Sequence, residues 1–266
     1  MATLEIHQFP CWQDNYGILI HDPQSGVTAA IDAPQESAVR EALKEKGLKL
    51  SYIFTTHHHH DHVEGHLGLK HETGCKIYGP ANEAADIPGI DATVKDGDRI
   101  PFGSFDVRVV ETPGHTRGQV TYFIPDCLPS ATEGARGVAF TGDTLFSVGC
   151  GRVIEGNHAQ MWHSLKKIAA LPPETLLYCG HEYTQSNIRF ALTVEPGNKA
   201  LIARKSEVDE LRGEGKPTLP VTLAGELQTN PFLRPDSPEI RQSLDFGLDA
   251  SDEEVFEELR RRKDRF

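Results

Sequence analysis

The chain has 266 residues, which is enough for one large domain or for a domain and a smaller partner, and its formal net charge is -12 at pH 7. This acidic balance argues against a general nucleic-acid surface, because phosphate binding draws on clustered Lys and Arg. The sequence shows neither a secretion signal nor a run of about 18 apolar residues, and its five cysteines form no Cys-x-x-Cys pair, so we expect a cytoplasmic protein with reduced thiols.

Short β-like runs alternate with helical stretches up to about residue 180. The runs cover residues 18–20, 27–31, 52–55, 76–78, 105–110, 120–124, 138–140 and 176–178, and helices are expected over 37–46 and 158–170. The polar segment 126–136 is interpreted as a surface loop. From residue 182 the pattern is helical, over 187–194, 199–211 and 252–263. This order predicts a layered α/β domain over residues 1–180 and a helical domain over 181–266.

A run of histidines follows the apolar segment 51–54. Residues 55–62 read Thr-Thr-His-His-His-His-Asp-His, and their place inside the chain excludes a purification tag. If residues 53–59 stay extended, His57 and His59 project to one side of the strand and His58 to the other. Asp61 and His62 follow at a turn. Nitrogen and oxygen ligands of this kind suit zinc, and catalytic metal pairs lie roughly 3.5 to 4 Å apart.

Three later strand-like segments end in a glycine followed by a residue that can bind a metal. These pairs are Gly114-His115, Gly142-Asp143 and Gly180-His181. A glycine lets the backbone turn, so the next side chain can point out from a sheet edge. Any one of these residues alone would more often be a turn or surface residue. Together with the histidine run, they predict a shared metal site.

The motif His57-x-His59-x-Asp61-His62, with His115, Asp143 and His181 downstream, resembles the metallo-β-lactamase superfamily. Within it, the chain is similar to glyoxalase II, the hydroxyacylglutathione hydrolases. That narrower similarity rests on segments 13–16, 141–146, 149–152, 179–184, 194–198, 229–234 and 260–266, which follow the family order over nearly the whole chain. The histidine motif is specific only to the superfamily, and the C-terminal segments select the branch. The resemblance implies an αββα sandwich with the metal site at one edge, followed by a smaller helical C-terminal domain.

The resemblance also implies a site with two divalent metal ions. His57, His59 and His115 would hold one ion, Asp61, His62 and His181 the other, and Asp143 would bridge them. Zinc is the expected metal, and iron or manganese would suit the same ligands. Asp61 and Asp143 would position a hydroxide between the metals for attack on the thioester carbonyl of S-(2-hydroxyacyl)glutathione. With S-D-lactoylglutathione the products are glutathione and D-lactate, the second step of methylglyoxal detoxification. We expect a monomer without nucleic-acid or membrane partners.

Four residues are expected to contact the glutathione part of the substrate: Arg152, Tyr183, Arg260 and Lys263. Arg152 occupies a family position that is often lysine, and Tyr183 matches a tyrosine that contacts glutathione. Ile154 departs from the family, which commonly has an aromatic residue there. Arg260 and Lys263 lie three residues apart on one face of the last helix, where two cations could bind one carboxylate. The alternative is that they only complement the helix dipole.

Several nearby residues are given other roles. Neither His58 nor His60 is assigned to a metal, and the thiols of Cys150 and Cys179 are expected to shape the site without acting as nucleophiles. His66, His71, His158 and His163 are interpreted as structural or solvated. Asp14, Asn15 and Asp32 are expected to fix turns or to hold ligand histidines.

Four other functions remain to be weighed against thioester hydrolysis. A β-lactamase of this fold would carry a secretion signal and lack the helical C-terminus, and a nuclease would need a basic track. A closed structural zinc site would favour cysteine ligands. The nearest rival is a glutathione persulfide dioxygenase, which shares much of the metal motif but lacks the C-terminal segments. Oxygen consumption with glutathione persulfide would separate the two enzymes.

Overall fold

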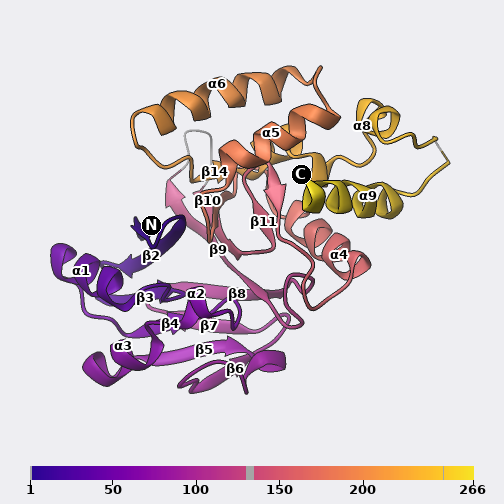
Figure 1. The fold of residues 1–266 in the computed structure, drawn as a ribbon. Coiled ribbons are helices and arrows are strands. Elements are labelled where there is room, and N and C mark those ends of the chain that lie inside the picture. Colours follow the sequence, from indigo (N-terminus) through magenta and orange to yellow (C-terminus); the bar gives the residue numbers. More distant parts are fainter. Residues whose placement is uncertain (1, 130–134, 248) are drawn as a thin grey trace.

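Two six-stranded sheets lie face to face, with helices on their outer sides (Figure 1), in a computed structural model that describes residues 2–129, 135–247 and 249–266. The first sheet has the order β1 (Glu5–Cys11), β2 (Asn15–Asp22), β3 (Val27–Ile31), β4 (Tyr52–Phe54), β5 (Lys76–Pro80) and β6 (Ala92–Val94). The second has the order β14 (Val221–Thr222), β13 (Leu176–Cys179), β10 (Ala135–Gly142), β9 (Val120–Pro129), β8 (Phe105–Glu111) and β7 (Arg99–Phe102). A small hairpin pairs β11 (Leu145–Phe146) with β12 (Gly149–Cys150).

Successive side chains along a strand point to opposite faces of the sheet and so enter different apolar layers. In β2, Ile18 and Ile20 enter the core between the two sheets, whereas Leu19 joins the cluster under the outer helices. In β10, Phe140 enters the central core and Ala139 faces the helices on the other side. Strands buried on both faces therefore have continuous apolar runs, as the sequence shows. The predicted αββα sandwich is confirmed.

Helices cover both outer faces. On the first sheet lie α1 (Glu36–Lys46) and α3 (His66–Thr73), and the one-turn helix α2 (His60–Val63) precedes α3. On the second sheet lie α4 (His158–Ala169) and α9 (Asp252–Arg265), joined by Trp162 and Phe256, whose rings stack at 5.6 Å. The remaining helices are α5 (Thr184–Val194), α6 (Lys199–Gly213), α7 (Leu223–Thr229) and α8 (Pro238–Ser243), with the 3-10 turns η1 (Ala81–Glu83) and η2 (Pro231–Leu233).

The helical C-terminal part shares a core with the sandwich. One apolar cluster joins Phe123 and Leu145 to Phe190, Phe232 and Phe256. The helices therefore pack onto the second sheet as a continuation of its outer layer. The predicted division of the chain at residue 180 remains a proposal.

The described residues of the segment predicted as a surface loop, 126–129 and 135–136, lie in strands. β9 continues to Pro129 and β10 begins at Ala135, and Leu128 pairs with Arg136 across the hairpin. Residues 130–134 lie outside the described residues. The prediction was wrong at the flanks because polar residues there occupy the exposed side of a long hairpin, while Cys127 is buried beneath it. The strand expected to continue over 53–59 ends at Phe54.

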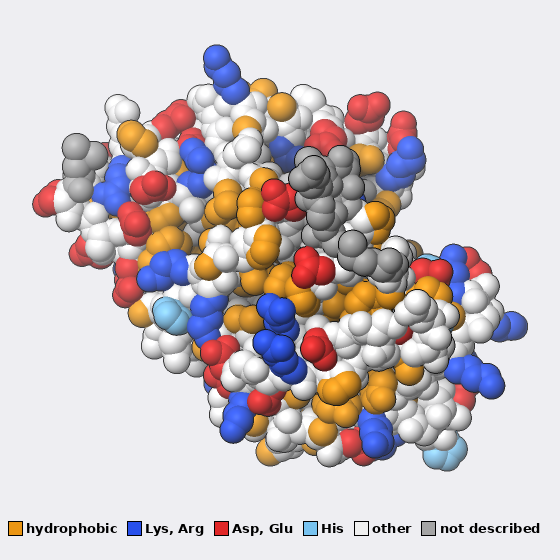
Figure 2. All heavy atoms as spheres, turned by 180° about the vertical axis from the view of Figure 1, so that it is seen from behind, with side chains coloured by type: hydrophobic (Ala, Val, Ile, Leu, Met, Phe, Trp, Pro, Cys, Tyr) orange, Lys and Arg blue, Asp and Glu red, His pale blue; other side chains and the backbone are white. Residues whose placement is uncertain are grey.

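Acidic and basic side chains are interspersed over the face shown in Figure 2, with hydrophobic side chains gathered along its middle. Although the chain carries a net negative charge, the face in view therefore has no large patch of only acidic or only basic side chains. Within the described ranges, every helix is too short or too polar to cross a bilayer.

Candidate metal site and adjoining pocket

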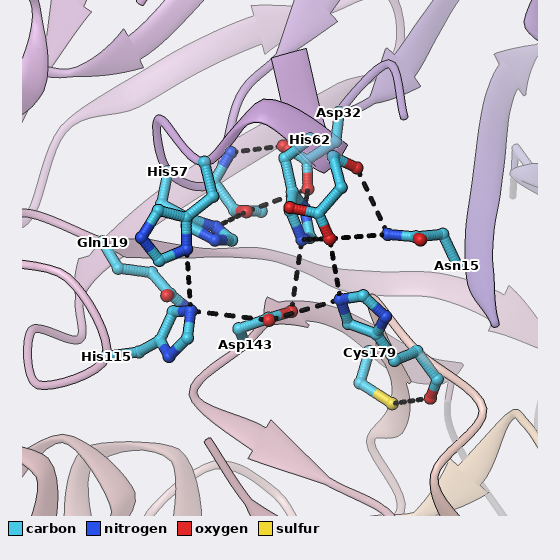
Figure 3. Close-up of polar contacts among 12 residues, drawn as sticks. Asn15, Asp32, His57, His62, His115, Gln119, Asp143 and Cys179 are labelled. Carbon is cyan, nitrogen blue, oxygen red and sulfur yellow. Dashed lines mark hydrogen bonds and ion pairs between the residues drawn. The ribbon is translucent and has the colours of Figure 1, made fainter. Parts of the chain in front are cut away.

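All seven predicted ligands meet at one edge of the sandwich, beyond the ends of four strands. The segment after β4 carries four of them, two within α2. Asp143 and His181 follow β10 and β13, and His115 lies in the turn after β8. Figure 3 shows the imidazoles of His62 and His115 in contact with the Asp143 carboxylate. Residues far apart in sequence thus face one small space.

The first ligand set comprises His57, His59 and His115, whose facing ring nitrogens lie within 4.8 Å of one another. His115 Nε2 and His59 Nδ1 are 3.0 Å apart. His58 points away, toward Glu83 and Glu155. The expected alternation of the three histidines therefore holds, although their backbone is not part of a strand.

The second ligand set comprises Asp61, His62 and His181. The Asp61 Oδ2 atom lies 3.4 Å from His181 Nε2 and 3.8 Å from His62 Nε2. Asp143 stands between the two sets, because its Oδ1 is 3.4 Å from His62 Nε2 while its Oδ2 is 3.5 Å from His115 Nε2 and 3.3 Å from His181 Nε2. This is the position that a bridging carboxylate requires.

Most ligand imidazoles are oriented through the nitrogen that faces away from the site. Four such contacts occur: His57 Nδ1 to Thr56 Oγ1 (3.0 Å), His62 Nδ1 to Asp32 Oδ2 (2.8 Å), His115 Nδ1 to the Arg152 carbonyl (2.8 Å) and His181 Nδ1 to Asp14 Oδ1 (3.0 Å). A carbonyl or carboxylate acceptor fixes the proton on Nδ1 and leaves the Nε2 lone pair toward the site. Asp14 and Asp32 thus act as expected, whereas Asn15 instead donates to the Asp61 carboxylate at 3.0 Å.

The charges of the buried histidines and carboxylates at this edge of the sandwich favour a bound cation. Burial lowers the pKa of His57 well below its usual value, aided by the neighbouring His62. Burial also opposes charge on His62, but the carboxylates of Asp143 and Asp32 outweigh it and raise the pKa of His62 to about 9. The pKa of Asp143 lies well below its usual value despite its burial, because His181 and His62 stabilise the carboxylate. A buried carboxylate that draws protons onto its neighbouring imidazoles is a setting in which a metal ion can take the place of those protons.

Three buried polar atoms supply a test of this fit. His57 Nε2, His62 Nε2 and Asp143 Oδ1 have no hydrogen-bond partner among residues 2–129, 135–247 and 249–266. Buried polar atoms are costly when unpaired. In addition, ligands about 2.1 Å from a tetrahedral ion lie about 3.4 Å apart, close to the separations within the site. The donor set therefore fits divalent metal ions.

The glycines before the late ligands act in two different ways. Gly114 and Gly142 have φ of 142° and 48°, so they permit the turns that were predicted. Gly180 has an ordinary φ, but a Cβ there would lie 2.7 Å from Asp143 Oδ1. At Gly151, which was not assigned this role, a Cβ would lie 1.9 Å from the Asp143 carbonyl oxygen. Glycine is therefore needed at some of these positions for a turn and at others because neighbouring atoms lie too close for a Cβ.

A pocket of about 330 Å³ runs from the metal site to α9. Its lining includes His115 and Asp143 at one end, all four predicted substrate residues, and Phe146, Cys150, Ser186, Asn187 and Asp264. None of the last five was assigned to the substrate, although Cys150 was expected to shape the site. A larger cavity of about 530 Å³ between α1 and α3 contains none of the metal-site residues, so size alone does not locate the site.

Within the pocket, Tyr183 and Lys263 are firmly held. The Tyr183 ring stacks on His181 at 4.7 Å. The Lys263 ammonium lies over the rings of Phe190 (5.5 Å) and Phe266 (5.2 Å) and donates to the Ser186 carbonyl at 3.2 Å. Burial, together with the neighbouring Arg260, lowers the pKa of Lys263 to about 8. The ammonium is therefore a cation whose charge changes near neutral pH.

Arg260 is less available than predicted. Its side chain is only 3% exposed, and its guanidinium donates to the Cys150 carbonyl at 2.8 Å and to the Asp264 carboxylate at 3.1 Å. It also packs over the Phe232 ring. Arg152, by contrast, is exposed at the pocket rim. Arg152 and Lys263 are thus better placed than Arg260 to meet an anionic ligand.

The other residues named from sequence lie around this centre. Ile154 is 51% exposed. Burial raises the pKa of the Cys150 thiol to about 11 and that of Cys179 further, which disfavours either as a nucleophile. His66 is buried and contacts Thr55 and the Pro88 carbonyl, away from both ligand sets. His60, His71 and His163 are exposed, and His158 lies near Glu257.

Comparison with known proteins places the two parts of the chain in one family. Residues 25–181 match the model of the metallo-beta-lactamase superfamily, and residues 182–266 match the hydroxyacylglutathione hydrolase C-terminus. Proteins named hydroxyacylglutathione hydrolase from Brucella ovis and Brucella abortus are each 56% identical over 264 residues, covering 99% of this chain and 98% of theirs.

Solved structures share the fold. ETHE1 from Myxococcus xanthus is 25% identical with a TM-score of 0.65, covering 95% of this chain and 94% of that protein. TTHA1623 in a di-iron-bound form is 22% identical with a TM-score of 0.59, covering 86% of this chain and 100% of that one. The C-terminal match, which spans α5 to α9, favours the hydrolase over the persulfide dioxygenase.

Proposed function

This chain belongs to the hydroxyacylglutathione hydrolase family of the metallo-β-lactamase superfamily, and we propose that it cleaves S-D-lactoylglutathione to glutathione and D-lactate. The observation that carries this proposal is a pocket that extends from His115 and Asp143 of the metal site to Lys263 of α9. A thioester carbonyl placed at Asp143 would leave the glutathione part extending toward Lys263. The same family membership places the reaction in methylglyoxal detoxification.

We propose that the first and second ligand sets each hold one zinc ion, with Asp143 shared. Imidazole and carboxylate ligands accept zinc readily, and three terminal ligands in each set leave room for a further group. When bound, the metals would supply a nucleophile derived from water at neutral pH and would stabilise negative charge developing on the carbonyl oxygen. Asp61 and Asp143 are the carboxylates that would orient the attacking water.

Residues of the chain supply binding and selectivity. The overall charge of -12 repels an anionic thioester, so Arg152 and Lys263 must provide local attraction. Tyr183 would offer the substrate a ring and a hydroxyl from the wall of the pocket, where its ring stacks on His181. The departing thiolate is a weak base, so a residue that protonates it is less necessary than in amide cleavage.

Hydrolysis of S-D-lactoylglutathione by metal-replete and chelated protein tests this function, with metal content measured on the same samples. We expect cleavage that disappears on chelation and returns with zinc, at two metals per chain. Absence of metal-dependent cleavage would refute the function, whereas one metal per chain would contradict only the dinuclear site. Oxygen uptake with glutathione persulfide would instead support the dioxygenase.

Replacing Lys263 by alanine should raise KM about 10-fold with little change in kcat, because a charged contact remote from the reacting carbon contributes about 1.4 kcal/mol to both bound states. Since the ammonium is charged below its pKa of about 8, KM of the wild type should rise as the pH increases beyond 8. Lys263→Arg should remove that rise, because arginine stays protonated. Steady-state kinetics across pH, with exposed Lys44→Ala as control, measures both effects. An unchanged KM in Lys263→Ala contradicts the contact.

We also propose that the enzyme acts as a cytoplasmic monomer. One chain supplies both ligand sets and the whole described lining of the pocket. All five cysteines are buried free thiols, which suits a reducing compartment. Sedimentation equilibrium of the metal-replete protein measures the assembly state.

A further inference from the structure

Glu83 is a buried carboxylate that takes no part in the proposed reaction. It lies in η1, is 1% exposed, and accepts three hydrogen bonds. Its Oε2 accepts from the His58 backbone N–H at 2.9 Å and contacts His58 Nδ1 at 2.8 Å, while its Oε1 accepts from the Gly118 N–H at 2.7 Å. Both oxygens are therefore committed to neighbouring chain segments.

These two segments carry the first ligand set. His58 stands between His57 and His59, and Gly118 follows His115 by three residues in the same turn. One carboxylate thus ties together two loops that follow strands of different sheets, β4 and β8. This link holds the loop that carries His57 and His59 at a fixed distance from the turn that carries His115.

Glu155 extends the connection on the solvent side. Its Oε1 lies 3.1 Å from His58 Nε2, and its Oε2 accepts from the Arg117 N–H at 3.1 Å. Its own N–H donates to the His115 carbonyl at 3.2 Å. The His58 ring is consequently held between two carboxylates, on the far side of the loop from the metal site.

The second ligand set is supported by side chains other than Glu83. Asp14 and Asp32 hold His181 and His62, and Asn15 holds Asp61. None of these contacts passes through Glu83 in the described part of the chain. Asp32 also reaches the first set, because it accepts from Thr56 Oγ1, which contacts His57 Nδ1. Among the described residues, the Glu83 carboxylate contacts only segments that carry the first set, so weakening it should leave the second set largely intact.

We propose that Glu83, through the His58 segment and Gly118, is a positioning residue specific to the first ligand set. The inference rests on the proposed metal binding but not on the identity of the substrate. Partners that orient metal ligands typically change metal affinity by about 10- to 100-fold when they are removed. The same loss is expected here, confined to one of the two metals.

Glu83→Gln tests the proposal with almost no change in size. Glutamine has one acceptor oxygen and one NH₂ donor, whereas both Glu83 oxygens face N–H donors. In either orientation the amide NH₂ group faces one of the two backbone N–H donors, of His58 or of Gly118, so one of these hydrogen bonds is lost. Zinc affinity of the first set should fall about 10- to 100-fold while that of the second set is retained.

Asp22→Asn is the matched control. Asp22 is also fully buried and accepts three hydrogen bonds, from Gln24 N–H, Ser25 Oγ–H and Ser104 N–H, at a site outside both ligand sets. It should lower thermal stability as Glu83→Gln does, yet leave both metals bound. Anomalous diffraction at the zinc edge, over a titration of zinc against a chelator, reports each set without any measurement of activity.

Gly118→Ala disturbs the same tie from its other end. A Cβ there would lie 3.0 Å from Glu83 Cγ and 2.8 Å from Asn82 Cβ, so η1 must shift. Selective loss of the first metal is expected again, and this variant decides the matter if Glu83→Gln does not fold. Full occupancy of both sets, equal loss from both, or an equal loss in Asp22→Asn would overturn the proposal. Wild-type protein that binds no metal would instead refute the proposed function.

Discussion

Asp143→Asn should lower kcat/KM by roughly 1,000-fold, the equivalent of about 4 kcal/mol of transition-state stabilisation. Its carboxylate reaches both ligand sets, with Oδ1 near His62 of the second set and Oδ2 near His115 of the first and His181 of the second. Asparagine removes the negative charge and replaces one of these oxygens by an NH₂ group, which cannot bind a metal ion. Both metals should therefore bind more weakly, and the separation between them should no longer be fixed.

Metal content after dialysis and steady-state kinetics with S-D-lactoylglutathione measure this effect. Asp22→Asn again serves as control, since it loses a buried carboxylate elsewhere in the fold. Excess zinc should restore part of the metal content of Asp143→Asn but little of its activity. A variant with two tightly bound metals and near wild-type turnover would show that Asp143 does not bridge.

Part of the metal site could be predicted from local backbone geometry, whereas the division of the ligands into two sets came from the family resemblance. Alternation separated His58 from its neighbours, although the strand itself ended at Phe54. Two of the three glycine turns have the positive φ that was expected. The last helix also follows its sequence signals, since Ser251 and Glu254 form the capping box in full.

Features that depend on distant contacts could not be predicted in this way. Glu83 lies 25 positions from the residue whose backbone it holds, and a lone glutamate after a strand has no distinguishing pattern. Arg260 looked like a free cation beside Lys263, but Cys150 and Asp264 already occupy its donors. Helix periodicity predicts that Arg260 and Lys263 share a face of the helix. It does not predict which groups of the neighbouring layer will form hydrogen bonds with them.

Gly151 is a second position at which a small change should have a large effect. An alanine Cβ would lie 1.9 Å from the Asp143 carbonyl oxygen and 3.3 Å from His115 Nδ1. Backbone must shift to relieve such an overlap, because neither neighbour is the flexible end of a side chain. Overpacking in a well-packed interior costs about 1–3 kcal/mol, and more where backbone is displaced.

Gly151→Ala should therefore lower the thermal midpoint and also reduce the increase in that midpoint produced by zinc, because a displaced Asp143 lowers metal affinity. Gly213→Ala is the control: nothing lies within 4 Å of its added Cβ at the end of α6, so helix propensity should stabilise it by about 0.5–1 kcal/mol. Thermal unfolding with zinc and with chelator separates the two effects. If Gly151→Ala lowered stability but kept the full zinc-dependent increase, the close approach would support the fold alone and not the position of Asp143.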